Sequence, residues 1–185
     1  MLFYVKKSLW LDLTVTLFLG GVGWLGIQYF SLPSVLLITP TAIFQGLASF
    51  LLITAWTFLV QRGYALIKGN DYAKALTEAL AKEYHDASLL KALAAGVTAA
   101  FGEELFFRGF IQQKWGLIAA CATFGIAHYG KKDIRIISHW SFIHGLLFGL
   151  SFKVTGNLLV PFLAHGLFDL GGVIYFPQVM RQKSP

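Results

Sequence analysis

The sequence predicts an all-α membrane protein with about six transmembrane helices, and three observations support this fold class. Only 13% of the residues are charged, roughly half the ~25% that is usual in soluble domains. Another 56% are hydrophobic and gather in long apolar runs, so the mean hydropathy is +0.64. The basic residues fall mainly at the ends of these runs, as in membrane proteins. The net charge of +6 therefore does not indicate a nucleic-acid partner, because these residues form no basic face.

Six apolar runs predict the helices in chain order. The first run follows Lys6 and Lys7, as in a signal peptide. It is longer than the apolar part of a typical signal peptide, and no cleavage site of small residues follows it. We therefore expect an uncleaved transmembrane helix there. The fourth run is short for a bilayer core of about 30 Å, so that helix is expected to be tilted, buried or beside a water-filled cavity. The predicted helices cover residues 9–30, 35–60, 89–110, 115–129, 136–153 and 158–176.

A polar connector, residues 61–88, separates the second and third predicted helices. Within it, Tyr72, Leu76, Ala79 and Leu80 recur at helical spacing among charged residues. This pattern is typical of an amphipathic helix that rests on a membrane surface. The whole chain, residues 1–185, is interpreted as one membrane domain, whose polar motifs lie within about residues 89–176.

The positive charges also predict the orientation in the membrane. If the N-terminus is cytoplasmic, every lysine and arginine except Arg108, Lys114 and Lys153 belongs to a cytoplasmic segment. The positive-inside rule therefore places both termini in the cytoplasm, and an even number of transmembrane helices agrees with this orientation.

Two adjacent carboxylates and an arginine interrupt the third apolar run. A charge at membrane depth costs about 2.5–3.5 kcal/mol on insertion scales and is usually paired and functional. Glu104 and Arg108 are four residues apart, so we expect them to pair on one helix face. Glu103 lies about 100° around the helix and can point elsewhere. A purely structural ion pair would explain Glu104 and Arg108 but would leave Glu103 as an additional buried charge. Because Glu103 is not explained in this way, the three residues favour a catalytic or ion-handling site.

Histidines occur on two further apolar runs. His128 lies at the end of the fourth predicted helix, and His165 shares a face of the sixth with Asp169, four residues later. A lone intramembrane histidine is often a packing residue, but buried polar groups need partners. If Glu103, His128, His165 and Asp169 converge, they form a water-activating site with a carboxylate base and groups that stabilise an oxyanion. The same set is also suited to a divalent metal.

Three motifs in chain order carry a specific resemblance. Glu103-Glu104-x-x-x-Arg108, Phe124-x-x-x-His128 and His165-x-x-x-Asp169 resemble the motifs of the CAAX protease and bacteriocin-processing family (CPBP, or Abi). Its members are intramembrane endopeptidases and include the type II CAAX prenyl endopeptidases. The resemblance covers about residues 99–170. Each motif alone is weakly specific, but all three on successive apolar helices are a strong signal.

The resemblance implies a role for each residue of the first two motifs. Glu103 would activate the attacking water together with His128. Glu104 and Arg108 would orient the site and neutralise its charge. The family has also been described as metalloproteases. A divalent metal such as zinc is therefore an open alternative, with Glu103, His128 and His165 as its candidate ligands, and no cofactor is certain from the sequence.

The third motif is implied to lie at the oxyanion side of the scissile carbonyl. Many family members have asparagine at the position of Asp169. An ionised aspartate accepts hydrogen bonds but cannot donate one, so Asp169 would be protonated, act through His165 or orient the His165 ring. Of the other histidines, His139 and His144 match no motif, and we expect packing or a helix–helix hydrogen bond for His144. Gly145 and Gly149 form G-x-x-x-G, which usually marks close helix packing.

The expected substrate is a membrane-embedded or membrane-associated peptide or protein, including the prenylated type, and the expected setting is a prokaryotic cell membrane. The sequence contains no H-E-x-x-H, G-x-S-x-G, rhomboid-like serine or G-x-G-D motif, which disfavours other classes of intramembrane protease. A non-catalytic membrane scaffold or a bacteriocin self-immunity protein on the same fold is the alternative. A small proton-coupled carrier is disfavoured by the lack of an internal repeat.

Overall fold

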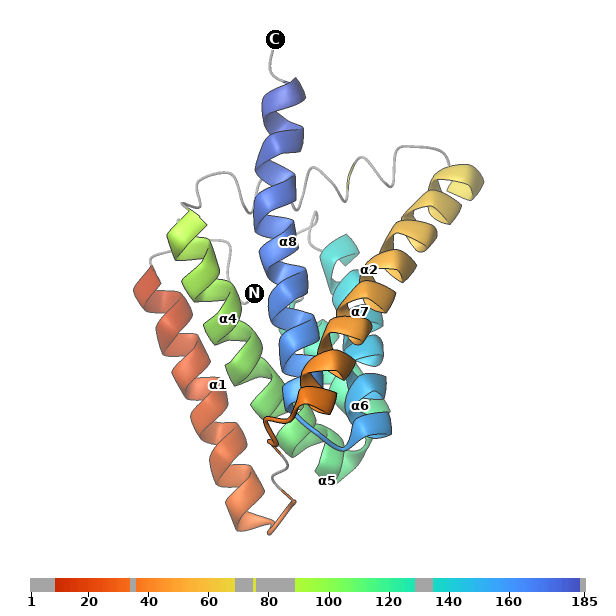
Figure 1. Cartoon of the computed structure of the whole chain (residues 1–185). Helices are drawn as coiled ribbons and strands as arrows, with labels where there is room; N and C mark the ends of the chain where they lie inside the picture. Colours follow the sequence, from red (N-terminus) through yellow and green to blue (C-terminus); the bar gives the residue numbers. More distant parts are fainter. Residues whose placement is uncertain (1–8, 34–35, 69–74, 76–88, 129–134, 184–185) are drawn as a thin grey trace.

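All regular elements among the described residues are helices (Figure 1). The structure is a computed structural model that describes residues 9–33, 36–68, 75, 89–128 and 135–183. The all-α prediction is confirmed for these residues, whereas the predicted amphipathic helix of the connector lies outside them. The elements are α1 (Leu9–Tyr29), α2 (Pro40–Lys68), α4 (Leu89–Glu104), η1 (Leu105–Gln112), α5 (Gln113–Trp115), α6 (Leu117–Ala127), α7 (Arg135–Thr155) and α8 (Leu159–Lys183).

One helix in the described part of the chain has the length and composition of a membrane span. It is the Pro40–Gly63 part of α2, with a mean hydropathy of 1.9, and only 17% of its most apolar stretch is buried in the protein. Most of its apolar side chains therefore face outward, as lipid contact requires. Other apolar stretches, in α1, α6 and α8, are shorter. The number of six transmembrane helices is not confirmed, because only one described helix is long and apolar enough to cross a membrane, and it stays a prediction.

Several helix boundaries differ from the predicted ones; among them, α2 ends at Lys68 instead of residue 60, and α8 ends at Lys183 instead of residue 176. The second helix begins at Pro40 instead of residue 35, because the Thr39 hydroxyl accepts a hydrogen bond from the Ala42 amide at 3.1 Å and proline suits the first helical position. The third helix does not end at residue 110. It continues through η1 and α5 to Trp115, and it breaks at Gly116, whose φ of +89° is a conformation that side chains with a Cβ rarely adopt.

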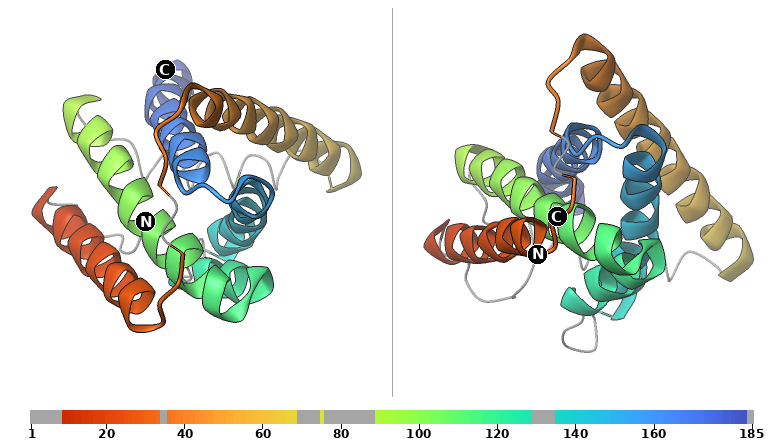
Figure 2. Two further views of the ribbon diagram at one scale, coloured as in Figure 1. Left: turned by 60° about the horizontal axis from the view of Figure 1, so that its bottom comes forward. Right: turned by 90° about the horizontal axis from the view of Figure 1, so that it is seen from below.

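The helices form a bundle around the contact between α4 and α8. The helix α1 packs along α4 and η1, whereas α2 packs along α8, and α6 packs along α7. Both views in Figure 2 show α1 alongside α4, and α2 on the other side of α8. The first two motifs, on α4, η1 and α6, are thereby brought next to the third motif on α8.

Glycines allow α1 to approach α4 and η1 closely. A Cβ on Gly102 would lie 2.7 Å from the carbonyl oxygen of Thr16, and a Cβ on Gly23 would lie 2.8 Å from the Cα of Phe106. Both distances are shorter than van der Waals contact, so a larger residue would push α1 away. The position of α1 therefore supports the segment of α4 and η1 that carries the first motif.

Candidate active site

The first motif lies where the α-helix α4 changes into the π-helix η1. Glu103 and Glu104 are the last two residues of α4, and Arg108 lies in η1. π-Helical turns are rare and occur frequently at functional sites. All three side chains are buried. The apolar residues around the motif predicted that these side chains are buried. They also suggested one continuous α-helix, so the π-helix was not predicted.

Glu104 is the centre of a buried hydrogen-bond network. Its Oε1 accepts a hydrogen bond from Arg108 Nη1 and another from His165 Nδ1, each at 2.8 Å. The exposed fractions are 1% for Glu104 and Arg108 and 5% for His165. The ion pair expected from the four-residue spacing is thus present. A carboxylate only accepts hydrogen bonds, so Nδ1 of His165 carries the hydrogen, and Nε2 is the nitrogen left for chemistry.

Arg108 connects four elements of the bundle. Besides its bond to Glu104, its Nη2 donates to the carbonyl oxygen of Gly145 on α7 at 3.1 Å. Its guanidinium lies over the ring of Phe124 on α6, 4.7 Å from the centroid, and 5.6 Å from that of Phe148 on α7. Planar contacts of this kind suit a guanidinium better than an ammonium group. Arg108 therefore holds α6 and α7 around the Glu104 carboxylate.

Two further carboxylates approach the other nitrogen of His165. Its Nε2 lies 3.9 Å from Glu103 Oε2 and 3.6 Å from Asp169 Oδ2. Both separations exceed a direct hydrogen bond, and polar atoms at such distances are often bridged by a water molecule. Glu104 thus holds the Nδ1 side of the His165 ring, whereas Asp169 lies on its Nε2 side. Glu103 and Asp169 therefore both lie near His165 Nε2, and these are three of the four residues whose convergence the sequence analysis considered.

His128 lies at the C-terminal end of α6, on the same side as Glu103. Its Nδ1 hydrogen-bonds the carbonyl oxygen of Phe124 at 2.7 Å, one helical turn earlier, and the two rings lie 4.6 Å apart. This contact explains the spacing of the Phe124-x-x-x-His128 motif. A carbonyl only accepts, so Nδ1 donates the hydrogen and Nε2 is left as an acceptor. The His128 imidazole is within electrostatic range of the Glu103 carboxylate.

The candidate metal ligands do not form a recognisable metal site. Among the residues that the structure describes, no three histidine, cysteine, aspartate or glutamate side chains gather as a metal ion requires. We therefore derive no step of the chemistry through a metal.

The other sequence features lie beside this network. His144 Nδ1 contacts the carbonyl oxygen of Trp140 at 2.9 Å and its Nε2 contacts Thr57 Oγ1 at 3.0 Å, which joins α7 to α2 and confirms the expected helix–helix hydrogen bond. His139 is exposed on α7. In the G-x-x-x-G pair, a Cβ on Gly145 would lie 3.3 Å from the Phe124 ring, which confirms close packing.

Sequence reasoning missed Gln112. Its Nε2 donates to the carbonyl oxygen of Gly149 at 2.8 Å, and the side chain is buried. Glu104, Arg108 and Gln112 follow one another at four-residue spacing, so a third polar residue on the same face of an apolar helix was the signal that could have identified it.

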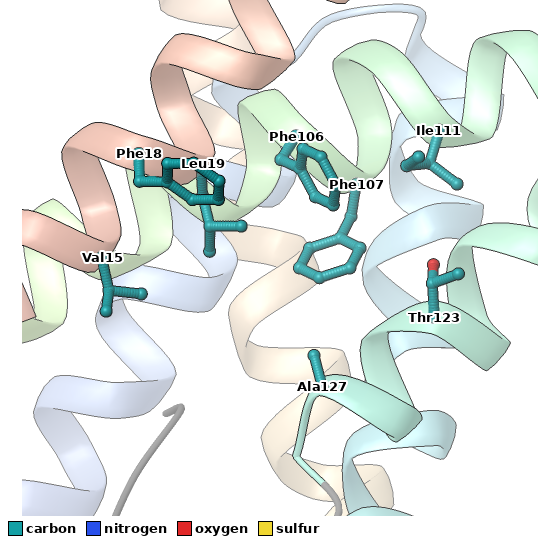
Figure 3. Close-up of a pocket in the computed structure, with 8 residues that line it drawn as sticks. All are labelled: Val15, Phe18, Leu19, Phe106, Phe107, Ile111, Thr123 and Ala127. Carbon is teal, nitrogen blue, oxygen red and sulfur yellow. The ribbon is translucent and has the colours of Figure 1, made fainter.

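An apolar cavity of about 350 Å³ adjoins the site between α1, η1 and α6 (Figure 3). Two of its lining residues are chain neighbours of motif residues, because Ala127 precedes His128 and Phe107 precedes Arg108. Figure 3 shows side chains from all three elements around this space. The lining residues are Val15, Phe18, Leu19, Phe106, Phe107, Ile111, Thr123 and Ala127.

Comparisons with known proteins agree with the motif pattern. A family model described as "Type II CAAX prenyl endopeptidase Rce1-like" matches residues 85–171. "Uncharacterized protein YpbD" of Bacillus subtilis (strain 168) is 38% identical over 91 residues, which cover 45% of this chain and 46% of that relative. The chain thus spans about half the length of the curated relative it matches. No solved structure matches the chain.

The matched segment contains every residue of the three motifs, from Glu103 to Asp169. The resemblance inferred from these motifs is confirmed. Residues 85–171, slightly less than half of the chain, match the type II CAAX prenyl endopeptidase Rce1-like family.

Proposed function

We propose that this protein is an intramembrane endopeptidase that hydrolyses peptide bonds in membrane-associated peptides or proteins. Its family is one of membrane-embedded proteases, which supports the reaction class. The observation that carries the proposal is the approach of Glu103 Oε2 to within 3.9 Å of His165 Nε2, while His165 Nδ1 is held by Glu104. This separation leaves room for one oxygen atom that contacts both groups.

Glu103 is the proposed general base. A water molecule near its Oε2 would lose a proton to the carboxylate as the water oxygen attacks the scissile carbonyl carbon. The Nε2 lone pair of His128 would accept a hydrogen bond from the same water and orient it. After the tetrahedral intermediate forms, Glu103 would pass the proton to the leaving amine nitrogen. The products are one new carboxyl terminus and one new amino terminus.

His165 is the proposed stabiliser of the oxyanion. When its ring is protonated, Nε2–H can donate to the negatively charged oxygen of the intermediate. The carboxylates of Glu103, Glu104 and Asp169 surround this ring and stabilise its positive charge. Asp169 thus acts through His165 instead of donating a hydrogen bond itself. Glu104 and Arg108 touch no reacting atom in this mechanism and serve as positioning residues.

The proposed setting is a lipid bilayer, with both termini on the cytoplasmic side. The outward-facing apolar side chains of α2 support the lipid contact. The apolar cavity beside the site offers space for an apolar part of the substrate. Substrates that combine a peptide bond with an apolar segment, whether a lipid group or a membrane helix, therefore suit this site best.

Hydrolysis by the purified protein tests the proposal. We expect the protein, reconstituted in lipid vesicles, to cleave some members of a panel of prenylated and membrane-segment peptides. In water enriched in ¹⁸O, one heavy oxygen should enter each new carboxyl terminus, which mass spectrometry detects. Vesicles without protein are the control. If a correctly folded protein cleaves no peptide in the panel, the protease proposal is wrong and the scaffold or immunity alternative is favoured.

Chelators are expected to leave the proposed activity unchanged. The mechanism uses carboxylate and imidazole groups alone, and the described residues do not gather three metal-binding side chains. The initial cleavage rate should therefore remain the same after dialysis against a strong chelator. A loss of activity that zinc restores, but magnesium does not, would contradict this prediction and make Glu103, His128 and His165 metal ligands.

A further inference from the structure

Two side chains of η1 hold α7 in one register. Arg108 Nη2 donates to the carbonyl oxygen of Gly145 at 3.1 Å, and Gln112 Nε2 donates to that of Gly149 at 2.8 Å. The donors are four residues apart on one helix, and the acceptors are four residues apart on the other. A helix carbonyl can accept a side-chain bond with its second lone pair. A slide of α7 along η1 would therefore break both bonds together.

The residue between these two anchors lies flat on the His165 ring. Phe148 is 1% exposed, and its ring stacks on the imidazole with centroids 4.6 Å apart and planes 20° apart. Phe124 contacts the same imidazole edge-on at 5.9 Å. The hydrogen bond to Glu104 sets the direction of Nδ1, and the Phe148 face sets the tilt of the ring. Together these contacts aim Nε2 at Glu103 and Asp169.

We propose that Gln112 and Phe148 are positioning residues for His165. Gln112 fixes the register of α7, and α7 in turn holds Phe148 flat against the imidazole. The effect on catalysis rests on the proposed function, but the effect on the ring of His165 does not. A misplacement of about 1 Å in a reacting group can lower a rate by about 10²-fold, so the orientation of this ring matters more than the packing energy of either residue.

The test replaces Gln112 and Phe148 by leucine, one at a time, and compares each variant with a matched control variant. Phe152 is also buried on α7, one turn beyond Phe148, so Phe152→Leu removes the same atoms away from the His165 stack. Gln113 bonds the carbonyl oxygen of Gly109 on its own helix, so Gln113→Leu removes an amide that does not reach α7. For the cleaved peptide, Gln112→Leu and Phe148→Leu should lower kcat by about 10- to 100-fold with KM nearly constant, whereas both controls should change kcat less than about threefold.

A second readout does not depend on activity. In protein labelled with ¹³C and ¹⁵N at histidine, the NMR signals of the His165 ring, assigned with a His165→Asn variant, should shift in Phe148→Leu because the stacked ring current is lost. They should also shift in Gln112→Leu, although Gln112 does not touch His165. Gly149→Ala disturbs the same bond from α7, because the added Cβ would lie 2.8 Å from Gln112 Oε1, and it would also displace the Leu117 side chain, whose Cδ1 lies closer still. This variant keeps the test available if Gln112→Leu does not fold.

The outcomes separate the two proposals. Unchanged His165 signals in folded Gln112→Leu and Gly149→Ala would overturn the positioning role and leave Gln112 as a packing residue. Shifted signals together with a fall in kcat would support it. If the wild type cleaves no peptide but the His165 signals shift as expected, the proposed function fails while the positioning role stands.

Discussion

Glu103→Gln is expected to lower kcat by about 10²–10⁴-fold, the range that general-base catalysis typically contributes. The amide has the same shape as the carboxylate but cannot take a proton from water. The thermal stability should be unchanged or higher, because Glu103 lies outside the Glu104–Arg108 bond and its charge is one of several negative charges around His165. Steady-state cleavage kinetics and the melting temperature in one detergent measure both effects.

Two controls define the role of the Glu103 carboxylate. Glu103→Asp retains a base but withdraws it by one methylene group, so its kcat should lie between those of wild type and Glu103→Gln. Gln113→Leu removes an amide that bonds a carbonyl oxygen of its own helix, and it should leave kcat nearly unchanged. A Glu103→Gln variant that retains more than about a tenth of the wild-type kcat would show that another group is the base.

Glu104→Ala is expected to destabilise the fold by about 3–5 kcal/mol and to abolish activity with it. The substitution leaves the buried Arg108 guanidinium without its carboxylate and removes the acceptor of His165 Nδ1. Arg108→Met should also destabilise the fold, because it leaves the Glu104 charge buried without its cation. Equilibrium unfolding in mixed detergent micelles gives both free energies.

The double variant Glu104→Ala with Arg108→Met distinguishes the effect of an unpaired buried charge from the effect of lost side-chain packing. Because it removes both charges, it should be less destabilised than the sum of the two single variants. The neighbouring glutamates are therefore expected to differ: loss of Glu103 affects the rate, and loss of Glu104 affects the fold. Equal stability of both single variants and the wild type would contradict the buried ion pair.

Much of the candidate site could be predicted because its contacts are local. The Glu104–Arg108 bond and the contact of His128 with the Phe124 carbonyl each span one helical turn. Helix geometry places residues four apart on one face whatever the rest of the fold does. The burial of the first motif and of His165 followed from the apolar residues around them. Close packing at Gly145 also followed from spacing alone.

Contacts between helices that are distant in the sequence could not be predicted from residue spacing. The bond between His165 and Glu104 joins residues 61 positions apart, and the bond of Gln112 to Gly149 joins residues 37 apart. Spacing suggested that Asp169 orients His165, because it lies one turn away on the same helix. The structure adds a contact that spacing could not show, because Glu104 holds Nδ1 at 2.8 Å while Asp169 lies 3.6 Å from the other nitrogen.

The sequence by itself therefore determined the helical class, the resemblance to the family and the candidate residues of the site. These follow from composition and from periodicity, which act within single helices. The tertiary structure alone decided which nitrogen of His165 is held and which faces Glu103, and how the π-helix η1 is joined to α7. The physical reason is that the relative position of two helices depends on many side chains packing at once, and no spacing within one helix records that arrangement.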